Sequence, residues 1–163
     1  MDEFIESIPQ LEDRIYIIGG PRKQALEEAL TLVLGILDKH FLCTEFFCLK
    51  DSQETIQNLL DEIAAAKGLG KGGPAIYTTI KNGNVEAVHD RMWGSKSRRF
   101  IRLTFIDSLE AMHKRGAKYD REEVLGSLPR YNPTIVVSEE LASAGSDTGQ
   151  YDSNGTTLYL TIK

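Results

Sequence analysis

The sequence has no long hydrophobic run, few cysteines and no excess of positive charge, and each lack excludes a class of protein. The longest apolar stretch, residues 29–37, is far shorter than the roughly 20 residues of a membrane span. Two cysteines in 163 residues exclude a disulfide-stapled scaffold and favour a reducing compartment. The net charge of −5 argues against a protein that coats nucleic acid by bulk charge. Because residues 1–6 lack the features of a signal peptide, we expect a cytoplasmic or nuclear protein with no membrane segment.

The 163 residues, 41% of them hydrophobic, are enough for one globular domain with an ordinary core. We expect a single domain over residues 1–163. Its core would span about residues 14–107, and residues 108–163 would form an accessory region with a flexible loop at 142–156, which is rich in Ser, Gly, Asp and Asn.

Hydrophobic periodicity predicts strands that alternate with helices in the first half of the chain. The expected strands cover residues 14–18, 44–49, 76–80, 85–88, 99–106, 134–137 and 157–162, and the expected helices cover residues 22–40, 52–67, 108–115 and 120–128. This order predicts an α/β fold, and specifically a two-layer α/β sandwich whose mixed sheet has its helices on one face.

Local signals mark several boundaries of these elements. Asp51 with Glu54, and Asp120 with Glu123, have the spacing of capping boxes at helix starts. Gly68 is placed to end the helix that precedes it in the left-handed conformation. Asn82-Gly83 between two β-prone runs predicts a hairpin.

The most informative stretch for function is residues 91–102. It holds five basic residues and no acidic one, so the rest of the chain carries 14 basic against 24 acidic residues. Arginines can grip phosphate with two hydrogen bonds, and an aromatic ring can stack on a base. We therefore interpret this stretch as a basic arm for RNA or another polyanion, while pairing with the protein's own acidic surface remains the alternative.

The order of elements from about residue 14 to residue 107 resembles the Alba-like family of nucleic-acid-binding proteins. The similarity lies in a strand at 15–18, a basic glycine turn at 19–23, helices at 25–37 and 52–67 around a strand at 45–49, and two strands around 91–102. The resemblance implies a dimer that presents its first turn and hairpin arm to DNA or RNA. The residues that would bind nucleic acid are Arg22, Lys23, Arg91, Trp93, Lys96, Arg98, Arg99 and Arg102.

Two other functions stay open from the sequence. An interaction or assembly subunit would dock a second copy or another protein on the apolar helix that carries Leu32, Leu34 and Ile36. A small enzyme would assemble its site from distant residues. The glycine-rich residues 68–73 resemble part of a KH-type Gly-x-x-Gly loop, but they lack the spacing of a nucleotide-binding P-loop because Pro74 follows Gly73.

No metal, cofactor or catalytic group is predicted. His40, Cys43 and Cys48 lack the spacing of a zinc site and are better interpreted as a helix end and two buried thiols. His89 beside Asp90 is interpreted as a solvated pair, although the sequence does not show whether His89, Cys43 or Cys48 joins a site formed in space.

Overall fold

The computed structural model describes residues 15–39, 43–70, 75–98, 101–129, 133–140, 150–151 and 157–161. Along the chain the elements are β1 (Ile15–Gly19), α2 (Arg22–Lys39), β2 (Cys43–Cys48), α3 (Gln53–Lys67), β3 (Ala75–Thr79), a 3₁₀ turn (Lys81–Gly83), α4 (Val85–Arg98), β4 (Ile101–Ile106), α5 (Arg121–Ser127), β5 (Thr134–Ser138), β6 (Gln150–Tyr151) and β7 (Thr157–Thr161). The predicted α/β class and the alternation of strands and helices in the first half are confirmed.

The described strands form one sheet in the order β3-β2-β4-β5-β1-β7-β6. Strands β1 to β5 pair only in parallel, so the predicted mixed sheet is wrong for this five-stranded part. Strand β7 extends it in parallel beside β1, and the two-residue β6 pairs antiparallel with β7 at the far edge. Strand β5 lies between β4 and β1, so residues beyond 107 supply a central strand.

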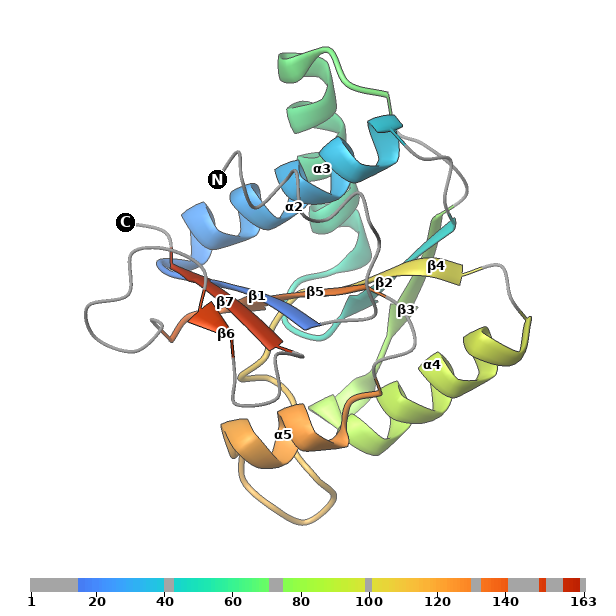
Figure 1. The fold of residues 1–163 in the computed structure, drawn as a ribbon, viewed down its shortest axis with the longest axis vertical. Helices are drawn as coiled ribbons and strands as arrows, with labels where there is room; N and C mark the ends of the chain where they lie inside the picture. Colours follow the sequence, from blue (N-terminus) through green and yellow to red (C-terminus); the bar gives the residue numbers. More distant parts are fainter. Residues whose placement is uncertain are drawn as a thin grey trace.

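Helices cover both faces of the sheet, which corrects the predicted two-layer sandwich with helices on one face. Figure 1 shows α2 and α3 on one side of the sheet and α4 and α5 on the other. Connections through α2 and α3 step outward from β1 to β3, whereas those through α4 and α5 step back to β5. Because parallel crossovers are right-handed, reversing the direction of travel places the second pair of helices on the opposite face.

Each face has its own hydrophobic core. Strand β1 is buried along its whole length and contributes Tyr16 and Ile18 to the core under α2 and α3. Its alternate residues Ile15 and Ile17 pack in the core under α4 and α5. A strand buried on both faces is continuously apolar, as parallel sheets require.

Helix α2 is buried on nearly every side. Leu32, Leu34 and Ile36, the residues predicted to dock a partner, are 1%, 0% and 2% exposed within this single chain. The prediction of a second copy or another protein on this helix stays untested, and the structure places these three side chains in the core. Among the described residues, no helix has the length and hydropathy that a bilayer crossing requires.

The helix caps show which local predictions were right. Ser52, and not Asp51, caps α3 by accepting a hydrogen bond from the Thr55 N–H at 3.1 Å. Gly68 ends this helix with φ +66°, as predicted, and Asp120 caps α5 through the Glu123 N–H at 3.0 Å. The predicted helix at 108–115 is absent, because this described segment forms turns.

The predicted hairpin at Asn82-Gly83 is also wrong. Both residues have positive φ, 65° and 62°, as a tight hairpin turn needs, but the chain enters α4 instead of returning as a strand. The start of α4 is tied to the segment after β4 by two 3.0 Å hydrogen bonds, from the Val85 N–H to the His113 carbonyl and from the His113 N–H to the Gly83 carbonyl. The strand at 85–88 and the hairpin arm of residues 91–102 therefore do not form: residues 91–98 belong to α4 and residues 101–102 open β4.

Several remaining predictions fall partly or wholly outside the described residues. Strands β5 and β7 confirm the runs predicted at 134–137 and 157–162, apart from residue 162, which is not described. In the loop predicted at 142–156, only Gln150 and Tyr151 are described, and they form β6. The division into a core and an accessory region within a single domain stays a prediction.

Candidate functional site

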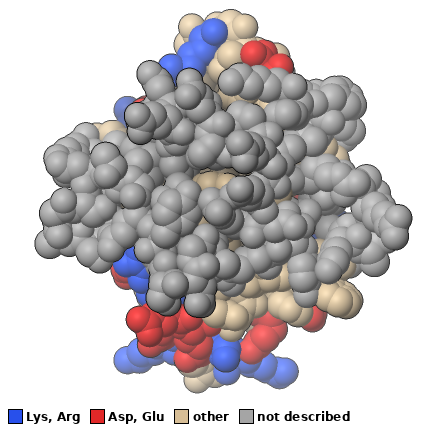
Figure 2. Space-filling view, viewed as in Figure 1, with Lys and Arg blue, Asp and Glu red and all other residues tan. Residues whose placement is uncertain are grey.

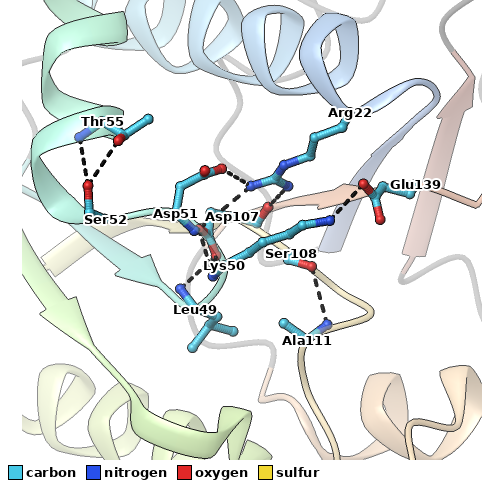
Figure 3. Close-up of polar contacts among 10 residues, drawn as sticks. All are labelled: Arg22, Leu49, Lys50, Asp51, Ser52, Thr55, Asp107, Ser108, Ala111 and Glu139. Carbon is cyan, nitrogen blue, oxygen red and sulfur yellow. Dashed lines mark hydrogen bonds and ion pairs between the residues drawn. The ribbon is translucent and has the colours of Figure 1, made fainter.

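The carboxyl ends of β1, β2, β4 and β5 meet at one edge of the sheet, and polar side chains gather there (Figure 3). In open α/β sheets this edge is where ligands bind. Only Gly20 and Pro21 separate β1 from α2. The Gly20 N–H donates to the Ser138 carbonyl at 3.1 Å, and the Pro21 carbonyl accepts from the Ala25 N–H at 2.8 Å. The turn is therefore short, and its backbone groups are engaged within the chain.

Arg22, the first residue of α2, reaches across this edge (Figure 3). Its guanidinium donates to the carboxylate of Asp51, at the end of β2, and to the backbone carbonyl of Asp107, which follows β4. It also lies 3.7 Å from the Asp107 carboxylate. The Arg22 side chain is only 20% exposed. One guanidinium thus joins the loops that follow β1, β2 and β4.

Asp107 is the buried centre of this arrangement, and its side chain has no exposed surface. Its two oxygens accept hydrogen bonds from three consecutive backbone N–H groups: Leu49 at 2.8 Å, Lys50 at 3.0 and 3.2 Å, and Asp51 at 2.8 Å. We call Arg22, the Asp51 and Asp107 carboxylates and these three N–H groups the edge network. All the donors come from nitrogen, so both Asp107 oxygens act as acceptors, as in an ionised carboxylate.

The edge network gives a pH dependence that can be measured. Burial raises the pKa of Asp107 above its ordinary value, although the N–H groups of Asp51, Leu49 and Lys50 and the charge of Arg22 oppose the rise. The folded chain therefore keeps this proton to a higher pH than the unfolded chain. Stability from the protonated form is complete below the unfolded pKa, near pH 4, and is lost as the pH rises through the folded pKa.

We expect the free energy of unfolding of the wild-type chain, relative to Asp107→Asn, to fall as the pH is raised from about 4 through the raised pKa. Urea unfolding of both chains at a series of pH values measures this difference. Subtracting the variant removes the titration of all other carboxylates. A difference that rises with pH over the same window would contradict the prediction.

A second set of contacts surrounds the edge network. Lys50 pairs with Glu139 at 2.7 Å, and both side chains are about two-fifths exposed. Glu110 accepts from the Ser138 hydroxyl and from the Glu139 N–H, each at 2.7 Å. These contacts attach the end of β5 to the segment after β4 and to the end of β2.

A separate buried ion pair lies under α4, away from this edge. Glu45, in β2, is 1% exposed, and one of its oxygens accepts from Arg91 Nε at 2.6 Å and from the Thr78 hydroxyl at 2.7 Å. Glu45 alternates with Phe46 along the strand and therefore faces the α4 side of the sheet. This pair ties β2, β3 and α4 together.

The structure does not bring the predicted nucleic-acid-binding residues together as an arm. Arg22 belongs to the edge network, and Arg91 is paired with Glu45. Lys23 is partly exposed at the start of α2, and Trp93 is 55% exposed on α4. Lys96 and Arg98 lie in α4 and Arg102 in β4, with side chains outside the described part of the structure, and Arg99 lies wholly outside it.

Charges on the described surface are mixed. On the face that Figure 2 shows, blue and red side chains lie interspersed at the end of the molecule that carries α5. The sequence there alternates basic residues, such as Lys114, Lys118 and Arg121, with acidic ones, such as Glu122 and Glu123. This mixture is that of an ordinary solvated surface.

The cysteines and histidines form no reactive site among the described residues. Burial raises the pKa of Cys48 to about 11, with the charges of Asp107 and Asp51 adding to the rise. Burial and Glu45 also raise the pKa of Cys43. Both thiols therefore stay protonated at neutral pH and are poor nucleophiles. His89 lies 3.5 Å from Asp90 on α4, and within the described part of the chain no three metal-ligating side chains converge.

Comparison with known proteins places the fold. No protein-family model matches the sequence, and no curated protein matches it. Among solved structures, the chain is similar to an ATPase domain of the DnaB family of replicative helicases, with a TM-score of 0.57 and 10% identity over 85% of this chain and 63% of that one. It is also similar to "The Structure Of A DnaB-Like Replicative Helicase And Its Interactions With Primase", with a TM-score of 0.53 and 10% identity over 88% of this chain and 44% of that one. The fold is RecA-like.

This result corrects the Alba-like resemblance and the function derived from it. The structural similarity is to the RecA-like ATPase domain of DnaB-family replicative helicases, over most of the chain. The shared order of elements misled because the hairpin that completed the Alba-like pattern is a helix, α4, followed by a parallel strand. The RNA-binding function based on that hairpin is therefore wrong. The chain spans less than two thirds of the length of either solved structure.

RecA-like folds raise the question of a nucleotide. A P-loop places Gly-x-x-x-x-Gly-Lys-Ser/Thr between a strand and a helix, so that backbone N–H groups and the lysine surround the phosphates. Here the turn after β1 contains two residues, and the chain continues Arg22-Lys23-Gln24. P-loop NTPases also use an Asp at a strand end to hold magnesium. Asp107 has that place after β4, but both of its oxygens are bonded to backbone N–H groups. The residues present do not fit a P-loop nucleotide site.

Sequence reasoning missed the roles of Asp51, Asp107 and Glu45. Asp107 carried a usable signal, because it comes directly after the buried strand 101–106 and so must lie at the carboxyl edge of the sheet. Arg22 was selected for its charge, but its partners lie 29 and 85 residues away in the sequence. No local pattern indicates contacts over such separations.

Proposed function

We propose that this chain is a RecA-like domain that works without binding or hydrolysing nucleotide, as a fixed structural domain. The observation that carries the proposal is the edge network, in which Arg22, Asp51 and Asp107 close the carboxyl edge where a P-loop domain holds phosphates. The RecA-like fold supplies the comparison, and the side chains of this chain supply the difference.

The proposal follows from how each group is used. A triphosphate needs backbone N–H groups and a free cation, whereas the Gly20 N–H is bonded to Ser138 and Arg22 is bonded to two aspartates. Magnesium needs an available carboxylate, whereas Asp107 is buried among N–H donors. A bound nucleotide would have to break these contacts and leave the Asp107 carboxylate buried without them, which is costly.

The same contacts explain what the domain gains. In many NTPases the γ-phosphate and its magnesium order the loops at this edge, and hydrolysis releases them. Here Arg22 and Asp107 join the loops after β1, β2 and β4 with groups of the chain itself. The edge therefore keeps one arrangement with no ligand, which suits a domain that holds a shape and does not switch.

Titration with Mg-ATP tests the proposal. We expect about 5 mM Mg-ATP, compared with the same concentration of magnesium chloride, to leave the melting temperature within about 1 °C. A ligand at about 100 times its Kd adds about 2.7 kcal/mol, which raises the melting temperature of a chain of this size by several degrees. A characterised P-loop ATPase in the same buffers serves as the positive control. A saturable rise for this chain, or release of phosphate above the level of a heat-inactivated sample, would overturn the proposal.

A further inference from the structure

Leu49, Lys50 and Asp51 point three consecutive backbone N–H groups at one position, and Asp107 occupies it (Figure 3). Successive N–H groups that converge in a turn form a concavity that binds anions. The distances of 2.8 to 3.2 Å are those of well-formed hydrogen bonds. The loop after β2 thus contains an anion site with a known occupant, a carboxylate.

Electrostatics at this position also favours an anion. The Arg22 guanidinium lies 3.7 Å from the occupying carboxylate and is itself largely buried. Screening by water is weak there, so its charge acts at close range. Lys50 does not compete for this place, because its ammonium group pairs with Glu139 at 2.7 Å.

The site is held in place by contacts other than those with Asp107. On one side it continues from β2, whose residues pair with β3 and β4. On the other side Ser52 caps α3 through the Thr55 N–H. Removing the Asp107 side chain would therefore leave the three N–H groups oriented around a buried polar space, where each lacks a partner. Unpartnered buried donors are costly, so a small anion of matching shape should bind there.

We propose that the N–H groups of Leu49–Asp51, together with Arg22, form an oxyanion-binding site that the chain fills with the carboxylate of Asp107, and that this site takes up a free small carboxylate when that side chain is removed. The proposal goes beyond the proposed function, because it names a ligand class. Its test uses no nucleotide, so either one can fail while the other stands.

The experiment uses the variant Asp107→Ala and sodium formate, whose carboxylate replaces the one removed. We expect the melting temperature of this variant to rise saturably with formate by about 3 to 6 °C at about ten times the Kd, relative to sodium chloride of the same ionic strength. The wild-type chain should change by less than about 1 °C between the two salts. In ¹H–¹⁵N spectra of the variant, the amide signals of Leu49, Lys50 and Asp51 should shift with formate and follow the same binding curve.

Glu139→Ala is the matched control, because it also loses a paired carboxylate but leaves the three N–H groups occupied. Its melting temperature should respond equally to formate and chloride. Equal responses of Asp107→Ala to the two salts would overturn the proposal, as would a formate response of the same size in Glu139→Ala. If Asp107→Ala is unfolded in chloride, folding in formate supports the site, and failure to fold in both salts contradicts it.

Discussion

Replacing Gly83 with alanine is expected to lower the free energy of unfolding by about 3 to 4 kcal/mol. A Cβ atom at this position would lie 1.7 Å from the Ala111 carbonyl oxygen, a backbone atom that cannot rotate away. The residue also has φ +62°, where a side chain is strained. Strain costs about 1 to 2 kcal/mol, and displacing the packed segment about 1 to 3 kcal/mol more. Urea unfolding of wild type and variant measures the difference.

Gly116→Ala separates the two causes. Gly116 has φ +75°, but nothing lies within 4 Å of the Cβ that alanine would add. This control should lose only the strain contribution, about 1 kcal/mol. Equal losses in the two variants would show that the close approach of Gly83 to Ala111 is not what makes alanine costly.

Arg91→Met is expected to destabilise the chain by about 3 kcal/mol. Methionine keeps much of the length of the arginine stem but leaves the Glu45 carboxylate, 1% exposed, without the guanidinium 2.6 Å away. Removing one partner of a buried pair costs about 3 to 5 kcal/mol, and we expect the lower end because the Arg91 side chain is 38% exposed. Chemical unfolding at about pH 7 gives the value.

Lys50→Met is the matched control for this prediction. It breaks the Lys50–Glu139 pair, which has a similar distance of 2.7 Å but lies at the surface, and should cost less than about 1 kcal/mol. The double variant Glu45→Gln/Arg91→Met should lose less than the sum of its two single variants, because it removes the buried charge along with its partner. A cost for Arg91→Met no larger than that for Lys50→Met would show that the Glu45–Arg91 pair does not support the fold.

The two polar clusters have different effects on the molecule. Glu45 and Arg91 join neighbouring elements beneath α4, whereas Arg22 and Asp107 join loops at the edge where RecA-like ATPases carry out their chemistry. Both bury a carboxylate together with its donors. In this chain the geometry of a fold and the chemistry of its edge are therefore separable: the sheet can be RecA-like while its edge is closed by the chain's own charges.

Local chemistry in the sequence predicted most of the elements. Apolar periodicity located β1, α2, β2 and α3, and the caps at Gly68 and Asp120 follow from the positive φ and the side-chain acceptor that helix ends require. The Asn82-Gly83 signal was also right in its local meaning, since both residues have positive φ. It failed only in predicting where the chain goes next.

That failure shows the limit of a local signal. Whether residues after Gly83 form a strand or a helix depends on the segment at Ala111–His113, which bonds to the start of α4 from nearly 30 residues away. The same limit applies to Arg91, which has the charge expected of a phosphate-binding residue but lies beside Glu45, 46 residues distant.

The sequence by itself determined the α/β class, the first four elements and most of the buried strands, because hydrophobic spacing and capping are properties of neighbouring residues. Only the tertiary structure decided the strand order, the placement of helices on both faces, and the use of Arg22 and Asp107 to close the edge of the sheet. These features depend on contacts between residues far apart in the chain, and their energies arise from burial and pairing that exist only once the sheet has formed.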